Sequence, residues 1–276
     1  MTDFAELRAK LPKKLPWTPV TVPVIRMTGL IAAREAAINL DRFASALTRG
    51  FTAAKAGEKL LILAIESPGG SPVQSDLIGR FIRRKAGETG VRVVAVIGDV
   101  GASGGYWIAC AADQIFANPM SIVGSIGVIG GGFGVPELIS RWGIERRIVT
   151  AGANKMRNDP FAPARPEDEQ FTRALLDDIH AGFKAWVRER RGAAIDGHED
   201  AIFDGSYMLG ERAKSLGLID GFGDVRSVIA ERFGAKARPD FIGPKKRFNL
   251  LRLLGRGAGA DILNAIEAEA MKARMR

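Results

Sequence analysis

Residues 91–113 read VRVVAVIGDVGASGGYWIACAAD and contain the pattern that decides the fold. The apolar, β-branched run at 91–97 is typical of a strand buried on both faces. A glycine-rich turn follows it, and residues 106–112 then have the apolar character of a short buried helix. A strand that passes through a tight turn into a helix is the repeating unit of an α/β sheet.

The same alternation recurs along the chain. Further buried strands are expected at 22–27, 60–65 and 144–149, and further helices at 38–54 and 73–85. A long amphipathic helix is expected over 166–190, with an apolar stripe that caps or lines the core and consists of Phe171, Leu175, Ile179, Phe183 and Val187. We therefore predict one α/β core domain at 21–243, with a parallel sheet.

Composition places the chain among ordinary folded proteins. Of 276 residues, 46% are hydrophobic and 26% are charged, which argues against disordered, collagen-like and coiled-coil classes. The single cysteine, Cys110, cannot close an intrachain disulfide, and the two histidines, His180 and His198, are too few for a structural zinc site. We expect no metal and no cofactor.

The positive charge is concentrated in two predicted arms, at 1–20 and 244–276. The net charge is +9, and residues 244–276 alone carry eight basic and three acidic side chains. A basic, leucine-bearing tail suits an anionic membrane surface, although a solvated tail or a subunit contact fits the same composition. Residues 1–20 do not have the pattern of a secretory signal. We expect a cytoplasmic protein with peripheral contact to the inner face of the membrane.

Two glycine-rich turns follow two neighbouring strands of the predicted sheet. ESPGGS (66–71) comes after the run at 60–65, and VGASGGY (100–106) comes after the run at 91–97. Because the carboxyl ends of parallel strands share one edge, both turns should converge there. Glycines leave backbone N–H groups exposed, and the second turn also begins a helix, which favours negative charge. This combination predicts an oxyanion hole.

Ser103 lies in the second turn, where its side chain could be a nucleophile or a helix cap. Neither histidine is placed to activate it, because both lie in charged, solvated surroundings. A lysine or a carboxylate remains as the base. Lys155 follows the apolar run at 144–149 and could reach the same edge, or it could be an ordinary surface lysine. To accept a proton it must be uncharged, which desolvation and nearby positive charge favour.

Five segments together resemble the S49 family of serine peptidases, which includes signal peptide peptidase A and SohB. They are ESPGGS (66–71), GASGGYWIACAAD (101–113), MSIVGSIGVIGG (120–131), TAGANKMRNDPF (150–161) and GERAKSLGLIDGFGD (210–224). The resemblance implies a ClpP/crotonase-like fold of repeated ββα units and assembly into a ring or bowl of identical subunits. It implies a Ser/Lys dyad that hydrolyses apolar or unfolded peptides, including remnants of signal peptides.

The resemblance also assigns roles to particular residues. It makes Ser103 the nucleophile, Lys155 the general base, and Ser125 the residue that orients the lysine. The backbone amides of Gly70 and Gly104 would bind the oxyanion. The chain departs from the family at Asn154, where a tyrosine is common before the lysine, and at Met156 after it. It also carries one copy of the core and no membrane anchor before it, so a single copy implies a homo-oligomer.

Two other functions remain open from the sequence. A crotonase-type acyl-CoA enzyme would share the oxyanion hole but would need a carboxylate in the pocket, for which Glu66 is the obvious candidate. A non-catalytic scaffold or nucleic-acid binder could use the basic arms. Nucleic acid is not the expected partner, because the core shows no basic face interleaved with aromatic residues.

Overall fold

The structure is a computed structural model, and it describes residues 19–244. Its strands are β1 Thr21–Thr28, β2 Leu60–Ser67, β3 Arg92–Ala102, β4 Gln114–Ala117, β5 Ile122–Gly124, β6 Tyr207–Leu209, β7 Gly221–Phe222 and β8 Arg238–Ile242. Its helices are α2 Leu40–Ala56, α3 Pro72–Thr89, α4 Gly104–Ala109, α5 Pro136–Arg141, α6 Pro166–Arg191, α7 Glu199–Ile202, α8 Gly210–Ser215 and α9 Val225–Phe233, with a 3-10 turn η1 at Gly192–Ile195.

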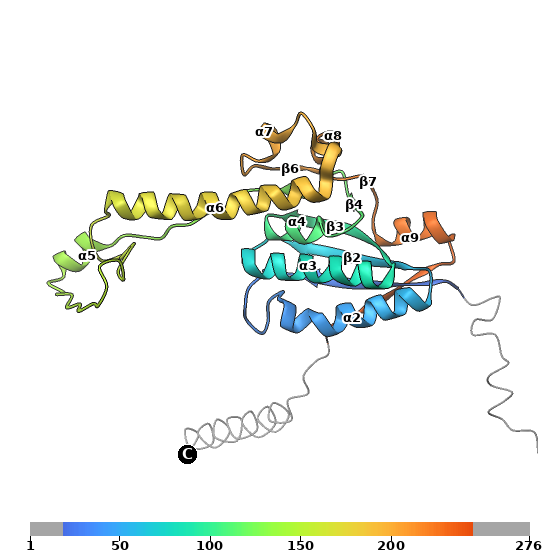
Figure 1. The fold of residues 1–276 in the computed structure, drawn as a ribbon, viewed down its shortest axis with the longest axis horizontal. Coiled ribbons are helices and arrows are strands. Elements are labelled where there is room, and N and C mark those ends of the chain that lie inside the picture. The colour runs from blue at the N-terminus through green and yellow to red at the C-terminus, as the bar shows by residue number, and fades with distance from the viewer. Residues whose placement is uncertain (1–18, 245–276) are drawn as a thin grey trace, which may run out of the picture. The chain divides into compact units, whose positions relative to one another are not determined.

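The strands form one eight-stranded sheet with β3 near its centre (Figure 1). The main order is β6-β5-β3-β2-β1-β8, and β4 pairs with β3 and with β7. Strand pairs are parallel throughout, except that β6 runs antiparallel to β5. Strands form at the predicted positions 22–27, 60–65 and 91–97, and helices cover most of 38–54 and 73–85. The helix predicted at 106–112 exists but begins and ends earlier, at Gly104–Ala109. The predicted α/β class is therefore confirmed.

Each face of the sheet carries its own hydrophobic core, because side chains alternate along the strands. Leu61 and Leu63 of β2 belong to the larger core, which also contains residues of α2, α3, α4 and α6. Leu60 and Ile62 point to the other face, where they pack with Val228 and others of α9. Burial on both faces explains why β2 and β3 read as continuous apolar runs.

The strand predicted at 144–149 does not exist. Residues 144–150 have no regular secondary structure and are exposed, Val149 completely so. The run has β-forming side chains, but a strand requires a neighbour that pairs with its backbone N–H and C=O groups. No other strand of the described chain lies beside this segment. Its β-forming side chains alone therefore do not make it a strand.

Helix α6 covers the core with only its C-terminal half. Phe183, Trp186 and Val187 are buried, whereas Phe171 and Leu175, predicted to lie on the same core-facing stripe, are about half exposed. Figure 1 shows the other half of the helix running beyond the sheet, together with α5 and the segments around it. We call residues 129–176 the extension. Its apolar side chains have no core beneath them, which is why the stripe prediction failed there.

The C-terminal half of α6 holds α4 in place. The Phe183 ring stacks on Trp107 of α4 with 4.6 Å between centroids. Trp186 Nε1 donates a hydrogen bond of 2.9 Å to the carbonyl oxygen of Trp107. Cys110, at the end of α4, is fully buried, and this burial raises the pKa of its thiol to about 12. The helix that follows Ser103 is thus fixed at Trp107, by α6, and at Cys110, by burial in the core.

The predicted arms at 1–20 and 244–276 fall outside the described residues, apart from residues 19, 20 and 244. The division of the chain into a core and two arms therefore stays a prediction. Within residues 19–244, no helix combines the length and the apolar character that crossing a bilayer requires.

Candidate active site

Ser103 lies at the turn between β3 and α4 in an unusual backbone conformation. Its φ is 50° and its ψ is −124°, a region that residues other than glycine seldom adopt. Its N–H donates to the carbonyl oxygen of Gly124 at 2.8 Å, and its carbonyl oxygen accepts from the N–H of Trp107 at 2.9 Å. The Ser103 side chain makes no capping hydrogen bond to α4. It is half-buried, and within the described chain its hydroxyl has no hydrogen-bond partner.

The glycine turn after β2 comes against the backbone of Ser103, as the topology predicted. A Cβ added at Gly69 would lie 2.7 Å from both Gly104 N and Ser103 Cβ. A Cβ added at Gly104 would lie 3.3 Å from Gly70 N. The N–H groups of Gly70 and Gly104 therefore lie close together beside the serine. Paired backbone donors next to a free hydroxyl can stabilise an oxyanion.

Ser125 follows β5 just as Ser103 follows β3. The two strands are parallel and pair Ala102 with Gly124, so the serines occupy matching positions on neighbouring strands. Ser125 also has a positive φ, 52°, and its N–H donates to the carbonyl oxygen of Ser206 at 2.8 Å. Its side chain is half-buried. The structure thus brings together four of the five predicted site residues: Ser103, Ser125, Gly70 and Gly104.

Glu66 does not join them. Its carboxylate accepts hydrogen bonds from the N–H groups of Asp99 at 2.8 Å and Val100 at 3.0 Å, both in the distal part of β3. By the alternation along β2, its side chain lies on the face that α9 covers, whereas Ser67 is on the Ser103 side. Because its oxygens are engaged on the opposite face, Glu66 does not supply the pocket carboxylate that a crotonase-type reaction needs. Within residues 19–244, no group of three or more metal-ligating side chains is placed to hold an ion.

His180 has a structural contact that the sequence did not reveal. Its Nε2 lies 2.9 Å from the carbonyl oxygen of Ile126, the residue after Ser125. The side chain is half-buried, so the expectation of a solvated histidine is wrong for His180. This contact fixes α6 against the segment that carries Ser125. Ile126 and His180 are 54 positions apart in the sequence, and no local sequence pattern predicts a contact over that separation.

The structure does not bring Lys155 to Ser103. Lys155 lies in the extension, in the segment between α5 and α6, and its side chain is exposed. Figure 1 shows α5 and the start of α6 well away from α4. The prediction that Lys155 follows a strand at the sheet edge is therefore wrong, because the strand at 144–149 does not form. No ion pair or hydrogen bond of its ammonium group joins it to another part of residues 19–244.

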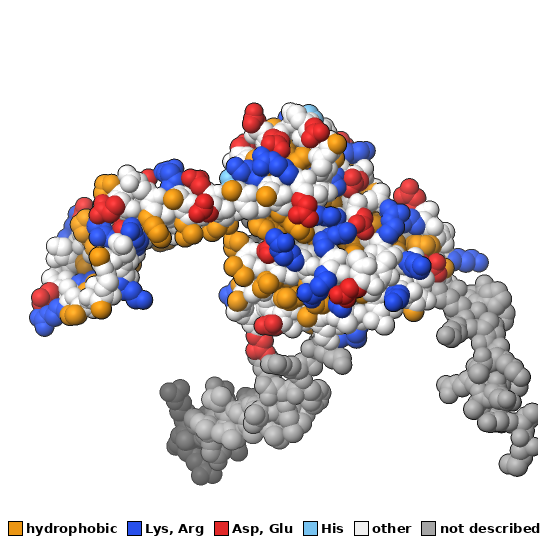
Figure 2. Space-filling view, in the orientation of Figure 1, with side chains coloured by type: hydrophobic (Ala, Val, Ile, Leu, Met, Phe, Trp, Pro, Cys, Tyr) orange, Lys and Arg blue, Asp and Glu red, His pale blue; other side chains and the backbone are white. Residues whose placement is uncertain are grey.

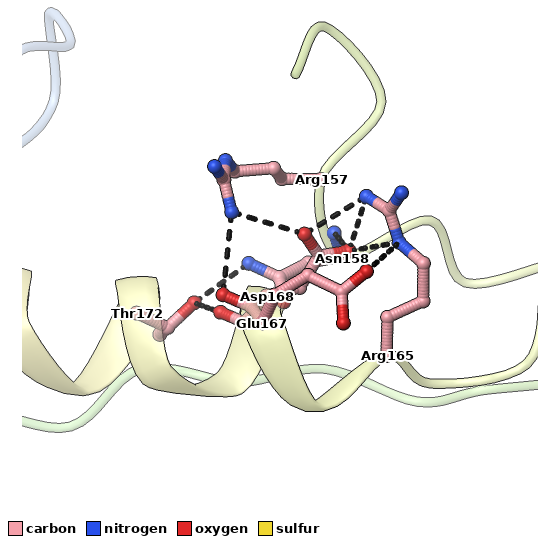
Figure 3. Close-up of polar contacts among 6 residues, drawn as sticks. All are labelled: Arg157, Asn158, Arg165, Glu167, Asp168 and Thr172. Atoms are coloured by element: carbon pink, nitrogen blue, oxygen red, sulfur yellow. Dashed lines mark hydrogen bonds and ion pairs between the residues drawn. The ribbon is translucent and has the colours of Figure 1, made fainter. Parts of the chain in front are cut away.

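The loop that carries Lys155 is fastened to the first turns of α6 (Figure 3). Asp168 accepts two hydrogen bonds of 2.8 Å from the Arg165 guanidinium and pairs with Arg157 at 3.1 Å. Asn158 Nδ2 donates to Thr172 Oγ1 at 2.8 Å. Burial of Asp168 opposes its ionisation, but the hydrogen bond from Arg165, the Asn158 N–H and the charge of Arg157 lower the pKa of its carboxyl.

The extension exposes many hydrophobic side chains. Ile129 is 96% exposed, Phe133 92% and Trp142 76%. Figure 2 shows hydrophobic side chains along the projecting half of α6 and the segments beside it. Such a concentration of exposed apolar side chains is typical of a surface that another molecule covers.

Comparison with known proteins identifies the family. Residues 85–236 match the profile described as Peptidase family S49, which is more than half of the chain. The chain belongs to peptidase family S49.

Relatives of this S49 peptidase include several proteases. It is 30% identical over 211 residues to a putative protease of Methanocaldococcus jannaschii, covering 74% of this chain and 67% of that protein. It is 27% identical to the probable protease SohB of Haemophilus influenzae, covering 91% of this chain and 68% of that protein. The predicted membership of family S49 is thus confirmed, and the sheet itself shows the predicted α/β class.

Another relative, which is not named as a protease, covers more of the chain at higher sequence identity. The Na(+)/H(+) antiporter NhaA of Brucella abortus is 41% identical over 262 residues, 92% of this chain but 34% of that protein. The S49 peptidase thus spans about a third of that relative's length. Among solved structures, a mutant of the 1510-N membrane-bound stomatin-specific protease aligns with a TM-score of 0.46 and 14% identity, over 83% of this chain and all of that one.

Proposed function

We propose that this S49 peptidase is a serine endopeptidase with a Ser103/Lys155 dyad. The observation that carries the proposal is the free hydroxyl of Ser103, held in a strained turn beside the N–H groups of Gly70 and Gly104. A strained turn at a helix N-terminus presents a serine side chain to substrate, as in other nucleophile elbows. Nothing else in the described chain gives Ser103 a structural task for its side chain.

The chemistry follows from these positions. Ser103 Oγ attacks the carbonyl carbon of the scissile bond while its proton passes to the uncharged amine of Lys155. The N–H groups of Gly70 and Gly104 stabilise the oxyanion that forms. Lys155 then returns the proton to the departing amine, which leaves an acyl group on Ser103. Water, deprotonated by the same lysine, hydrolyses this ester and releases Ser103. Ser125 accepts or donates a hydrogen bond at the lysine and orients it.

We further propose that Lys155 reaches Ser103 from a neighbouring copy of the chain. The loop of Lys155 is bound to α6 at Thr172, whereas α6 touches the segment after Ser125 at His180. Eight residues of helix separate these two contacts, about 12 Å along the axis. The loop is thus anchored away from its own serine. The exposed apolar side chains of the extension support burial against another subunit, in the ring or bowl expected for the family.

The proposed substrates are apolar or unfolded peptides, including remnants of signal peptides. Leu30, Val73 and Leu77 are all more than 40% exposed. They lie close to the oxyanion turn. Leu30 precedes Ile31, whose carbonyl oxygen accepts from Ser71 N–H at 2.8 Å, and Val73 and Leu77 lie in the first two turns of α3. An exposed apolar rim at this place favours apolar side chains of a bound peptide.

The dyad is tested with a serine-directed fluorophosphonate and a fluorogenic apolar peptide amide. We expect Ser103→Ala to abolish labelling, and Ser103→Ala, Lys155→Ala and Lys155→Arg each to abolish hydrolysis without unfolding the protein. The arginine variant should be inactive because a guanidinium does not give up its proton. Substantial activity in Lys155→Arg would show that another group is the base.

Co-expression of Ser103→Ala with Lys155→Ala tests the contribution from the neighbouring copy. If the dyad forms between subunits, mixed assemblies contain sites with an intact serine from one chain and an intact lysine from the other. Activity should then return to a measurable fraction of wild type. A dyad formed within one chain gives no activity in the mixture.

We also propose that residues 244–276 bind anionic membrane surfaces, on the grounds of their eight basic side chains and leucine content. Co-sedimentation with phosphatidylserine-containing vesicles should be lost when these residues are deleted and should weaken as salt concentration rises. Neutral phosphatidylcholine vesicles are the control. Equal sedimentation with and without residues 244–276 would contradict the proposal.

A further inference from the structure

Asp168 is the single buried residue of the extension. Every other residue from 129 to 176 is exposed or half-exposed, whereas Asp168 is 4% exposed. Its side chain is 6% exposed, the same fraction as that of Arg191, which pairs with Asp220. A buried carboxylate is costly unless hydrogen bonds and opposite charges surround it. Its presence in an otherwise open part of the molecule therefore calls for a specific reason.

The partners of Asp168 come from the stretch of chain between Lys155 and α6 (Figure 3). Arg157 and Asn158 follow the lysine by two and three residues, and both bind Asp168, through a guanidinium at 3.1 Å and a backbone N–H at 3.4 Å. Arg165 supplies the third partner from the residue that precedes α6. The carboxylate thus joins the chain just after Lys155 to the first turn of the helix.

Two further contacts limit how this junction can move. The Arg157 guanidinium stacks on the ring of Phe171 at 4.3 Å, one turn along α6. Asn158 has a positive φ of 53° and hydrogen-bonds Thr172, so its backbone and side chain are both fixed. On the other side of the lysine, Arg146 pairs with Asp159 and closes the base of the segment. The orientation of Lys155 therefore depends on the contacts that Asp168 organises.

We propose that Asp168 is a positioning residue that holds Lys155 in the orientation required to serve as the base. This inference rests on the proposed function of Lys155. The carboxylate contacts neither serine nor oxyanion turn, and it acts through the Arg157–Asn158 junction. Displacing a catalytic group by about 1 Å can cost on the order of a hundredfold in rate, even when the change lies outside the reacting atoms.

Asp168→Asn tests the role, because the amide keeps the shape but loses the charge that binds two guanidinium groups. We expect kcat for the peptide amide to fall tenfold or more while KM stays within twofold of wild type. Glu169→Gln is the matched control: Glu169 is exposed, is the next residue on the same turn, and pairs only with Arg173. It should retain wild-type kcat. A wild-type kcat in Asp168→Asn would overturn the proposal.

Complementation separates a positioning role from a general loss of structure. Co-expressed with Ser103→Ala, which carries an intact Lys155 segment, Asp168→Asn should regain activity, because its own serine can use the partner's lysine. When Asp168→Asn is co-expressed with Lys155→Ala, activity should stay low, because neither chain then supplies a correctly placed Lys155. Recovery with both partners, or with neither while Ser103→Ala and Lys155→Ala do complement each other, would exclude the positioning role.

The outcomes also distinguish this inference from the proposed function. If wild-type protein shows no hydrolysis dependent on Ser103, the peptidase proposal fails and Asp168 has no reaction to support. If hydrolysis depends on Ser103 and Lys155 but Asp168→Asn behaves as wild type, the peptidase proposal stands and the positioning role alone is wrong. Arg165→Gln provides a second variant should Asp168→Asn aggregate, and its kcat should fall in the same way.

Discussion

At the scale of residues, Gly70 occupies a position that no other amino acid fits. Its φ is 141°, outside the range that L side chains readily adopt. A Cβ at this position would collide with the carbonyl oxygen of Ile31, whose N–H and C=O groups bind Gly69 and Ser71 on either side. The turn can therefore accept a side chain only by moving, and Gly70 N–H would move with it.

This geometry predicts the effect of Gly70→Ala. Relieving the collision should displace the N–H group from the oxyanion and lower kcat on the order of a hundredfold to a thousandfold, the cost of losing one oxyanion donor. Strain at the positive φ should reduce the free energy of unfolding by about 1–3 kcal/mol. Steady-state kinetics and urea denaturation measure the two effects separately.

Gly87→Ala is the control for Gly70→Ala. Gly87 lies in α3 with ordinary helical φ, and a Cβ there would have no neighbour within 4 Å. Replacing it should leave kcat unchanged and stabilise the protein by about 0.5–1 kcal/mol, because alanine loses less backbone freedom on folding. An unaltered kcat in Gly70→Ala would mean that its N–H group does not contact the oxyanion.

The convergence of Ser103, Gly70 and Gly104 could be predicted from topology alone, whereas Ser125 was expected beside them only from the resemblance to family S49, because no strand was predicted before it. Parallel neighbouring strands end at one edge, so any turn that follows them lies there. The location of Lys155 could not be predicted in this way. Its segment follows no strand, and its contacts depend on Asp168, which comes 13 positions later and looks in the sequence like one of several acidic residues at a helix start.

At the scale of elements, α6 shows what hydrophobic periodicity can and cannot reveal. The pattern predicted the helix to within one residue of its observed bounds, Pro166–Arg191. It also predicted that one stripe faces apolar surroundings, which is true of Phe183 and Val187 in the core. Phe171 and Leu175 continue the same stripe into solvent. Periodicity identifies a surface that needs a partner, but it does not say whether the partner belongs to the same chain.

The segment at 144–149 shows that side-chain pattern alone does not predict a strand either. Its β-branched residues Ile144, Ile148 and Val149 favour a strand, although three charged residues, 145–147, lie between them. Strand formation also requires backbone partners, which come from distant parts of the chain or from another molecule. Here Arg146 pairs with Asp159, which ties the segment to the loop before α6, whereas Arg147 pairs with Glu145 within the segment itself.

At the scale of the whole molecule, the extension has the properties of an interface element. Within residues 129–176 the apolar side chains are exposed and the single buried group is an ion-paired carboxylate. A segment of this kind gains stability when its apolar surface leaves water, by about 25 cal/mol per Å². Assembly with other copies would provide that burial and would also carry each Lys155 toward another chain's Ser103. Assembly and activity should therefore be lost together.

Val149→Glu tests this coupling, since Val149 is fully exposed in the extension and contributes nothing to the core. Burying an unpaired carboxylate at an interface is unfavourable, so sedimentation velocity should show the variant shifted to smaller species than wild type. Its hydrolytic activity should fall with the fraction assembled, while the thermal midpoint of the core stays unchanged. Ala53→Glu, at an exposed position of α2, introduces the same charge away from the extension and should sediment as wild type. A Val149→Glu protein that is monomeric yet fully active would show that Lys155 serves the Ser103 of its own chain, because a monomer has no neighbouring subunit to supply the base.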